Sequence, residues 1–202
     1  MINKTGNLTV ICGPMFSGKT EELLRRIRRA QYGMKKIQIC KHSIDDRYEK
    51  KYVISHLGDK IEAILLTKSQ DLLDIVKIDS EIIAIDEIQF FDLSIISAIV
   101  ELRDKGFEII VSGLDLDFRG IPFGPMPYLL ALADEVIKLK AVCFKTGKDA
   151  QYSQRLINGN PAKHTDPIIL VAATDCYQAR SRDAFEIDYI PLKEYLHEKI
   201  NC

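Results

Sequence analysis

The residues Gly13-Pro14-Met15-Phe16-Ser17-Gly18-Lys19-Thr20 stand between two different sequence patterns. Before them, Leu8–Cys12 is a short run of apolar and β-branched residues, which is typical of a buried strand. After them, apolar residues recur at helical spacing over residues 20–32. The quoted residues match G-x-x-x-x-G-K-[ST] and lie where that pattern must lie, after a strand and at the start of a helix. The sequence therefore predicts a phosphate-binding loop at residues 13–20, the phosphate loop, rather than an ordinary glycine-rich turn.

The residue types in the phosphate loop suit a nucleoside triphosphate. Glycines let backbone N–H groups close around phosphate oxygens, and the start of a helix adds partial positive charge. Lys19 is expected to reach the β- and γ-phosphates, and Thr20 is expected to present its hydroxyl to Mg²⁺. All the residues of the phosphate loop are therefore candidates for binding ATP.

A second pattern supplies the carboxylate that a nucleotide-bound Mg²⁺ needs. Residues 82–85 are apolar, and Asp86 and Glu87 follow them at the expected end of a strand. We expect Asp86 to bind Mg²⁺ and Glu87 to accept a proton from an attacking hydroxyl or water. These residues leave the acceptor open, because water would make the protein an ATPase and a bound alcohol would make it a kinase.

Short apolar runs alternate with helical patterns along most of the chain, which is the signature of βαβ units and a mainly parallel sheet. Strands are expected at residues 8–12, 36–40, 61–66, 81–86, 108–112 and 136–142, and helices at 20–32, 69–76, 93–105 and from 191 onward. Residues 113–127 are crowded with glycine, proline and phenylalanine and predict a long functional loop. The expected fold class is α/β: a RecA-like P-loop fold, with helices on both faces of its sheet, spans residues 1–142. A small β-rich lobe spans 143–190 and a tail spans 191–202.

Composition narrows the class of protein. The chain has 202 residues, 47% of them hydrophobic and 28% charged, which suits one globular domain with a small appendage. With 28 Lys and Arg against 29 Asp and Glu, the net charge of -1 argues against a dedicated nucleic-acid-binding protein. The basic cluster at residues 25–29 is interpreted as a solvated helix face or a subunit contact. There is no apolar stretch of eighteen residues and no apolar signal region, so we expect a cytoplasmic protein without a membrane partner.

Several short motifs follow the phosphate loop in a recognisable order. They are Asp45-Asp46-Arg47-Tyr48, Ser55-His56, Asp86-Glu87-Ile88-Gln89-Phe90-Phe91, Gly113-Leu114-Asp115-Leu116-Asp117-Phe118-Arg119-Gly120-Ile121-Pro122-Phe123-Gly124 and Tyr152-Ser153-Gln154-Arg155-Leu156. Their order resembles that of the type II (cytosolic-type) thymidine kinases, and the resemblance runs from about Leu8 to Arg182. It implies transfer of the γ-phosphoryl group of ATP to the 5′-hydroxyl of thymidine in nucleotide salvage for DNA synthesis. Whether deoxyuridine is also used is left open.

The resemblance also implies roles for individual residues. Glu87 would be the catalytic base that takes the proton from the nucleoside hydroxyl. Outside the phosphate loop, the ATP-binding candidates are Arg47, Asp86 and Gln89, although a solvent-facing loop arginine is the alternative for Arg47. The candidates for binding the nucleoside are Phe90, Leu114, Phe118, Phe123, Ser153, Arg155, Leu170, Ala172 and Tyr177. Plain core packing is the alternative for the phenylalanines, because buried phenylalanine is common.

The β-rich lobe resembles the lasso of this family, which closes over the pyrimidine, and we call residues 143–190 the lasso lobe. The family usually holds the base of its lasso with a structural zinc on two CxxC pairs. Here the corresponding residues are Cys143-Phe144-Lys145-Thr146 and Ser181-Arg182-Asp183-Ala184, so only Cys143 remains. One thiolate cannot replace four tetrahedral ligands. We therefore expect ATP and Mg²⁺ as cofactors but no structural zinc, with packing and hydrogen bonds in its place.

Two other classes of protein are alternatives to a thymidine kinase. One is a RecA-like P-loop ATPase that remodels a macromolecule, which the small size and neutral charge of the chain oppose. The other is a non-catalytic nucleotide-binding regulator, which the presence of Lys19, Thr20, Asp86 and Glu87 opposes. The resemblance further implies a homo-oligomer, the homotetramer typical of the family, and feedback inhibition by thymidine triphosphate. Thymidine and ATP are the expected partners.

Overall fold

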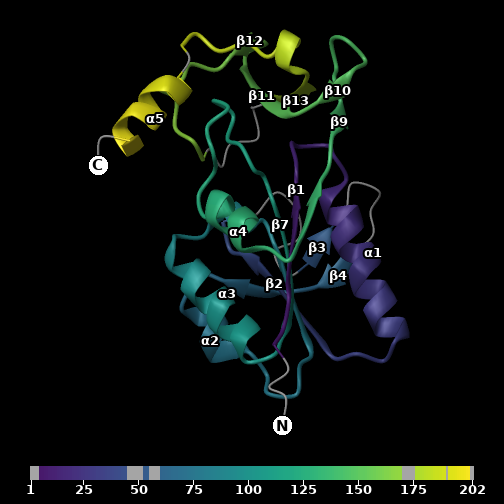
Figure 1. Cartoon of the computed structure of the whole chain (residues 1–202). Helices are drawn as coiled ribbons and strands as arrows, with labels where there is room; N and C mark the ends of the chain where they lie inside the picture. Colours follow the sequence, from purple (N-terminus) through teal and green to yellow (C-terminus); the bar gives the residue numbers. More distant parts are fainter. Residues whose placement is uncertain (1–4, 45–51, 55–59, 170–175, 190, 201–202) are drawn as a thin grey trace.

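The central feature of the molecule is a parallel sheet, seen nearly edge-on in Figure 1. The computed structural model of the chain describes residues 5–44, 52–54, 60–169, 176–189 and 191–200. Within these residues the central sheet has six strands in the order β5-β2-β6-β7-β1-β8, and every neighbouring pair is parallel. The strands are β1 (Leu8–Cys12), β2 (Ile37–His42), β5 (Ile64–Leu66), β6 (Ile82–Asp86), β7 (Glu108–Gly113) and β8 (Glu135–Lys138). The prediction of an α/β fold with a mostly parallel sheet is confirmed.

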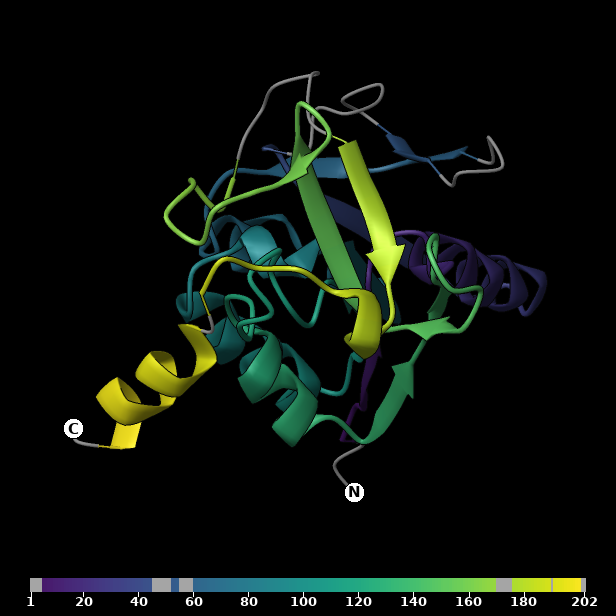
Figure 2. The ribbon, with the colours of Figure 1, turned by 90° about the horizontal axis from the view of Figure 1, so that it is seen from above.

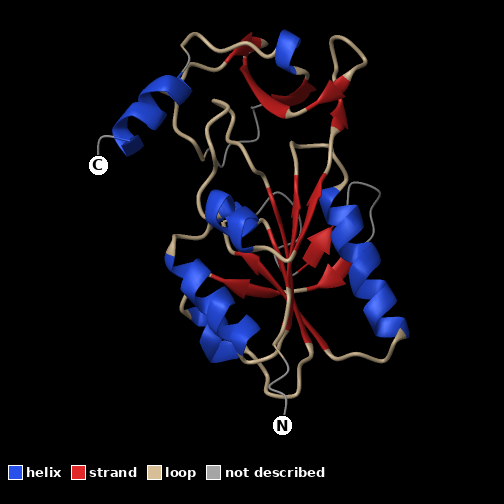
Figure 3. Cartoon of the chain, in the orientation of Figure 1, coloured by secondary structure: helices blue, strands red, loops and turns tan. Residues whose placement is uncertain are grey.

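Helices cover both faces of the sheet, as Figure 3 shows most plainly. Helix α1 (Lys19–Tyr32) covers one face and buries Leu23, Leu24 and Ile27 there. Helices α2 (Asp71–Ile75), α3 (Ser94–Asp104) and α4 (Met126–Leu132) cover the other face. Within the described residues, none of these helices combines the length and apolar character that crossing a bilayer requires.

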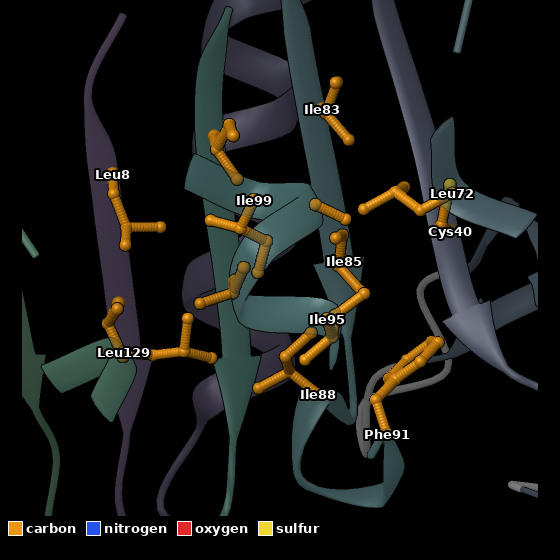
Figure 4. Close-up of a cluster of buried hydrophobic side chains, with 14 of the residues drawn as sticks. Leu8, Cys40, Leu72, Ile83, Ile85, Ile88, Phe91, Ile95, Ile99 and Leu129 are labelled. Atoms are coloured by element: carbon orange, nitrogen blue, oxygen red, sulfur yellow. The ribbon is translucent and has the colours of Figure 1, made fainter. Parts of the chain in front are cut away.

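The core between the sheet and α3 is built from alternate residues of the strands. Ile83 and Ile85 of β6 lie on this face, where Ile95 and Ile99 of α3 pack over them (Figure 4). Successive strand residues face opposite sides, so the residues between them belong to the cluster under α1. Each fully buried side chain of this size stabilises the fold by roughly 1.5–3 kcal/mol. The resulting rigid sheet fixes the strand ends at which the polar residues lie.

Two expected strands were predicted wrongly, because each is divided in the structure into two strands of different sheets. The run 61–66 contains two strands: β4 (Lys60–Glu62) pairs antiparallel with β3 (Tyr52–Ile54), whereas β5 joins the central sheet. The run 136–142 likewise divides into β8 in the central sheet and β9 (Ala141–Val142), which pairs with β10 (Asp149–Ala150). Both runs are mostly apolar, and a change of pairing partner leaves no mark on that pattern.

Helix α4 was not predicted, and its first two residues lie inside the glycine- and proline-rich segment 113–127 that was expected to be a loop. The helix begins at Met126 with a proline on either side. Neither proline is costly, because the first turn of a helix has no internal partner for its N–H groups. Met126 and Leu129 are fully buried against the sheet, so tertiary packing stabilises this short helix.

The lasso lobe lies beyond the carboxyl ends of the central strands (Figures 1 and 2). Its main sheet is antiparallel and has β11 (Tyr152–Ile157) between β12 (Asn160–Pro161) and β13 (Cys176–Arg180). A single turn, η2 (Arg182–Ala184), and helix α5 (Pro191–Ile200) complete the described part of the chain. Small antiparallel sheets beside the parallel one agree with the predicted β-rich lobe.

Candidate functional site

The phosphate loop joins the carboxyl end of β1 to α1. Gly18 caps the helix in the left-handed conformation, with φ of 82°, and Phe16 also has a positive φ of 65°. Gly13 has φ of 144°, and a Cβ there would lie only 2.5 Å from the carbonyl oxygen of Leu139. The loop therefore depends on glycine at both ends, and its tight turn brings backbone N–H groups together at the helix start.

Lys19 lies inside this loop. Its Nζ donates a hydrogen bond of 2.7 Å to the carbonyl oxygen of Pro14, and the residue is only 9% exposed. A buried ammonium at the amino end of a helix is an environment that stabilises an anion. The loop, as the structure describes it, is thus chemically suited to a polyphosphate.

Asp86 ends β6 beside the phosphate loop. Its Oδ1 accepts hydrogen bonds from the hydroxyl of Ser112 on the neighbouring strand β7 and from the backbone N–H of Glu87. Its Oδ2 lies 3.5 Å from the hydroxyl oxygen of Thr20. Thr20 and Asp86 therefore supply two hard oxygen atoms at one point, the donor type that Mg²⁺ prefers.

Within the described residues, there is no group of three or more His, Cys, Asp or Glu that could hold a metal ion. This does not oppose a magnesium site. Mg²⁺ usually keeps several waters and is bound by one or two protein oxygens together with substrate phosphates. The Thr20–Asp86 pair fits that mode and does not fit an all-protein cage.

Glu87 follows Asp86 in a left-handed backbone conformation, with φ of 54° and ψ of 43°. This conformation is uncommon for a residue with a side chain and costs on the order of 1 kcal/mol. The carboxylate accepts a hydrogen bond from Nε2 of Gln89, which is buried in the short helix η1 (Ile88–Phe90). Oε1 of Gln89 in turn accepts a hydrogen bond of 3.1 Å from the backbone N–H of Leu114. Gln89 therefore connects Glu87 to the segment after β7.

Residues 114–125, hereafter the aromatic loop, follow β7. Asp117 organises the loop: its carboxylate is buried and accepts hydrogen bonds from the backbone N–H groups of Arg119 and Ile121. The guanidinium of Arg119 also pairs with it at 2.6 Å. Such a charged side chain inside a loop replaces the regular backbone bonding that the loop lacks.

The structure brings the predicted phenylalanines together in two places. The rings of Phe90 and Phe123 meet edge to face, with centroids 5.9 Å apart. Phe118 is almost completely buried, and the guanidinium of Arg155 lies 5.3 Å from its ring centroid. Phe90 and Phe123 are partly exposed, whereas Phe118 is buried in the contact between the aromatic loop and Arg155 of the lasso lobe.

Strand β11 carries the other predicted lobe residues. The hydroxyl of Ser153 accepts a hydrogen bond of 2.9 Å from the backbone N–H of Met15 in the phosphate loop. Arg155 is fully buried and donates from Nη1 to the carbonyl oxygen of Pro167 at 2.7 Å. Tyr177 on β13 is the partner of Arg155 in the strand register. Arg47, Leu170 and Ala172 lie outside the described residues.

Sequence reasoning missed an ion pair beside the phosphate loop. Lys138 of β8 lies 2.9 Å from the carboxylate of Asp115, which is buried. The hydrogen bond that Lys138 donates to Asp115 raises the pKa of Lys138. Burial and the nearby Asp115 raise the pKa of the Cys12 thiol to about 11. A charged residue just past the end of an apolar strand was the available signal for Asp115, as it was for Asp86.

The four positions that match the two CxxC pairs converge at the base of the lasso lobe. The hydroxyls of Thr146 and Ser181 are 3.1 Å apart, and Ser181 donates to Sγ of Cys143 at 3.3 Å. Ala184 belongs to the same buried apolar cluster as Cys143. Burial raises the pKa of the Cys143 thiol, but hydrogen bonds from Ser181 and Thr146 outweigh that effect and hold it at about 6. Hydrogen bonds and apolar packing thus join the two turns.

A comparison of the chain with models of protein families matches residues 6–185 to the model described as thymidine kinase. The matched segment includes the phosphate loop, Asp86, Glu87, the aromatic loop and strand β11. It therefore covers every part of the candidate site.

Proposed function

Because this chain belongs to the thymidine kinase family, and is accordingly a phosphotransferase, we propose that it transfers the γ-phosphoryl group of ATP to the 5′-hydroxyl of thymidine. The observation that carries the proposal is the chain of hydrogen bonds from Glu87 through Gln89 to Leu114. It ties a carboxylate next to the phosphate loop to the aromatic loop, where a nucleoside can bind. A phosphate site and an aromatic site on either side of one carboxylate suit transfer to a bound alcohol.

The phosphate loop would hold the triphosphate. Its backbone N–H groups and the buried ammonium of Lys19 provide fixed positive charge, which stabilises the charge on the transferred group without reorganisation. Thr20 and Asp86 would hold Mg²⁺ together with the nucleotide. Mg²⁺, when bound, supplies further neutralisation of the phosphate oxygens.

Glu87 would accept the proton of the nucleoside 5′-hydroxyl. Its backbone conformation and the hydrogen bond from Gln89 restrict where the carboxylate can lie, so little reorganisation is needed when the hydroxyl binds. Phe90 and Phe123 offer a partly exposed apolar surface that suits the flat base and sugar. Excluding water at this surface favours the alcohol over hydrolysis of ATP.

The role of Glu87 is tested by Glu87→Gln, which keeps the size of the side chain and removes the base. We expect kcat for thymidine to fall about 10²- to 10⁴-fold, the usual contribution of general base catalysis, while the Kd for ATP stays near that of the wild type. Glu81→Gln is the matched control, since Glu81 is exposed and directly precedes β6, whereas Glu87 directly follows that strand. A variant Glu87→Gln with the wild-type kcat would remove the role assigned to this carboxylate.

The competing function, a P-loop ATPase, differs in the fate of the γ-phosphate. With labelled ATP, we expect thymidine to receive the label and inorganic phosphate to form slowly. Deoxyuridine in place of thymidine then measures whether the pocket requires the methyl group. Label that appears mainly as inorganic phosphate in the presence of thymidine would refute the kinase proposal and favour the ATPase.

We further propose that the lasso lobe of this chain holds no structural zinc. The support is that Cys143, Thr146 and Ser181 already bond to one another where a metal would otherwise be needed. Elemental analysis of the purified protein should give far less than one zinc per chain. About one tightly bound zinc per chain would contradict this part of the proposal.

A further inference from the structure

Lys41 is a buried lysine to which the proposed mechanism gives no role. It lies near the carboxyl end of β2, and only 1% of the residue is exposed. Strand β2 pairs with β6 in a register that makes Lys41 the direct partner of Asp86. Neighbouring strands of a sheet lie about 4.8 Å apart. A buried positive charge therefore starts from the strand position beside the carboxylate that suits Mg²⁺.

Both side chains leave the sheet on the face that α1 covers. Ile39, two residues before Lys41, and Ala84, two residues before Asp86, belong to the buried cluster under α1. Residues two positions apart in a strand share a face of the sheet. Helix α1 also carries Thr20, whose hydroxyl lies 3.5 Å from Oδ2 of Asp86. Lys41 consequently lies on the same side of the sheet as the Thr20–Asp86 pair.

The charges of the described residues at this end of the sheet balance one another. The carboxylates of Asp86 and Glu87 are matched by the buried ammonium groups of Lys19 and Lys41. The ion pair that Lys138 forms nearby adds no net charge. A free divalent cation therefore meets no excess of negative charge, whereas a nucleoside triphosphate carrying Mg²⁺ is an anion that both ammonium groups attract. Such forces are strong here, because charges held away from bulk water are weakly screened.

We propose that Lys41 determines the form in which the site accepts magnesium: its charge favours the anionic complex of Mg²⁺ with a nucleoside triphosphate and disfavours the free cation. This inference rests on the proposed function. Removing the charge of Lys41 must weaken the binding of the nucleotide and strengthen the binding of the free cation. These two changes have opposite signs, whereas a damaged structure around Asp86 would weaken the binding of both.

The test uses the full chain and measures binding instead of turnover. Isothermal titration calorimetry gives the Kd of a non-hydrolysable ATP analogue, with Mg²⁺ and again in EDTA. The electron paramagnetic resonance signal of free Mn²⁺, a substitute for Mg²⁺, gives the Kd of the cation alone. For Lys41→Met we expect the Kd of the analogue with Mg²⁺ to rise about tenfold, which equals ~1.4 kcal/mol, and the Kd of Mn²⁺ to fall about threefold. The rise should be larger in EDTA, because Mg²⁺ then no longer neutralises part of the charge on the analogue.

Two further variants separate the position of the charge from its removal. Lys36→Met makes the same change of net charge just before β2, where Lys36 is exposed and pairs with Asp79. Both Kd values should stay within about twofold of the wild type, because salt screens exposed charges. Lys41→Gln keeps a polar side chain without the charge and should shift both Kd values in the same directions as Lys41→Met.

The results for the wild type and the variants bear on different claims. A wild type that does not bind the ATP analogue refutes the proposed function, and the inference with it. If the wild type binds the analogue but the variants at position 41 do not lower the Kd of Mn²⁺, the inference alone is refuted. Equal shifts in Lys36→Met would also refute it, because the net charge of the chain would then be sufficient. If neither variant at position 41 folds, the wild type decides: Mn²⁺ that binds as tightly without the analogue as with it overturns the inference, and binding that requires the analogue supports it.

Discussion

Restoring cysteine at three positions should create a zinc site at the base of the lasso lobe. The variant is Thr146→Cys, Ser181→Cys and Ala184→Cys, which together with Cys143 gives two CxxC pairs. In the structure the hydroxyls of Thr146 and Ser181 are 3.1 Å apart, and the hydroxyl of Ser181 is 3.3 Å from Sγ of Cys143. Four sulfurs bound at about 2.3 Å in a tetrahedron stand ~3.8 Å apart. The atoms of these two pairs must therefore move apart by only about 0.5–0.7 Å.

The free energies can be estimated from the same contacts. Without metal, the variant loses the two hydrogen bonds of Ser181, at about 1 kcal/mol each, and should melt about 4–8 °C below the wild type. Free zinc at about 100 times its Kd would stabilise the folded variant by about 2.7 kcal/mol. The melting temperature should then rise by about 5–11 °C, and EDTA should reverse the rise.

The measurements are the zinc content after gel filtration and thermal melts with zinc or with EDTA. One zinc per chain in the triple variant is expected, and the wild type is the control, with a melting temperature that zinc does not change. The single variant Thr146→Cys has only two thiolates and should not retain zinc. A triple variant that folds and binds no zinc would refute the argument, because the four positions could not then surround one point.

Three other outcomes follow from single residues. The thiol of Cys143 should ionise near pH 6, so the difference in absorbance at 240 nm between the wild type and Cys143→Ser should rise through that pH. Hydrogen bonds from Arg25 and Arg26 lower the pKa of Glu22 from 4.5 to about 2, so its stabilisation is present above pH 4.5 and is lost as the pH falls toward 2. After solvent screening, these ion pairs contribute less than ~1 kcal/mol to the free energy of unfolding. The contribution is measured as the difference in the free energy of unfolding in urea between the wild type and Glu22→Gln. Gly113→Ala would place a Cβ 2.5 Å from Oε1 of Gln89 and should lower kcat by disturbing the partner of Glu87, measured by steady-state kinetics.

Each of these three predictions can be contradicted by a specific result. An absorbance difference that first appears above pH 8 would show that Cys143 is an ordinary thiol. A stability difference for Glu22→Gln that persists unchanged at pH 2 would contradict the ion pairs. For Gly113→Ala the control is Gly147→Ala, since a Cβ at Gly147 would meet nothing within 4 Å. Equal effects of the two substitutions on kcat would leave the contact with Gln89 without a role in catalysis.

Much of the fold could be predicted from local patterns. The strand Leu8–Cys12 was predicted with its observed bounds, and α1 begins within one residue of its expected start. The reason is that the phosphate loop needs particular backbone conformations, and glycine at positions 13 and 18 reveals them directly. Asp86 was likewise identified from its place at the end of an apolar strand, because a charged residue in such a buried run is rare unless it is paired.

Other parts of the candidate site depend on contacts between distant segments. Ser153 was expected near the nucleoside, but its bond to Met15 requires the lasso lobe to fold back over the phosphate loop. Gln89 was expected at ATP, and the structure places its amide between Glu87 and Leu114. Neither partner could be read from residues nearby in the chain, since side-chain neighbours across the fold are not encoded in local spacing.

The amino-acid sequence by itself determined the alternation of strands and helices around the central sheet, the phosphate loop and the residue types available at the strand ends. These follow from backbone preferences and from the alternation of apolar residues, which act over a few neighbouring positions. Tertiary structure alone decided that the run 136–142 divides between two sheets, that α4 forms, and that Cys143 meets Ser181. The physical reason is that pairing and packing depend on which surfaces the whole chain buries together, and that choice is made only when distant segments come into contact.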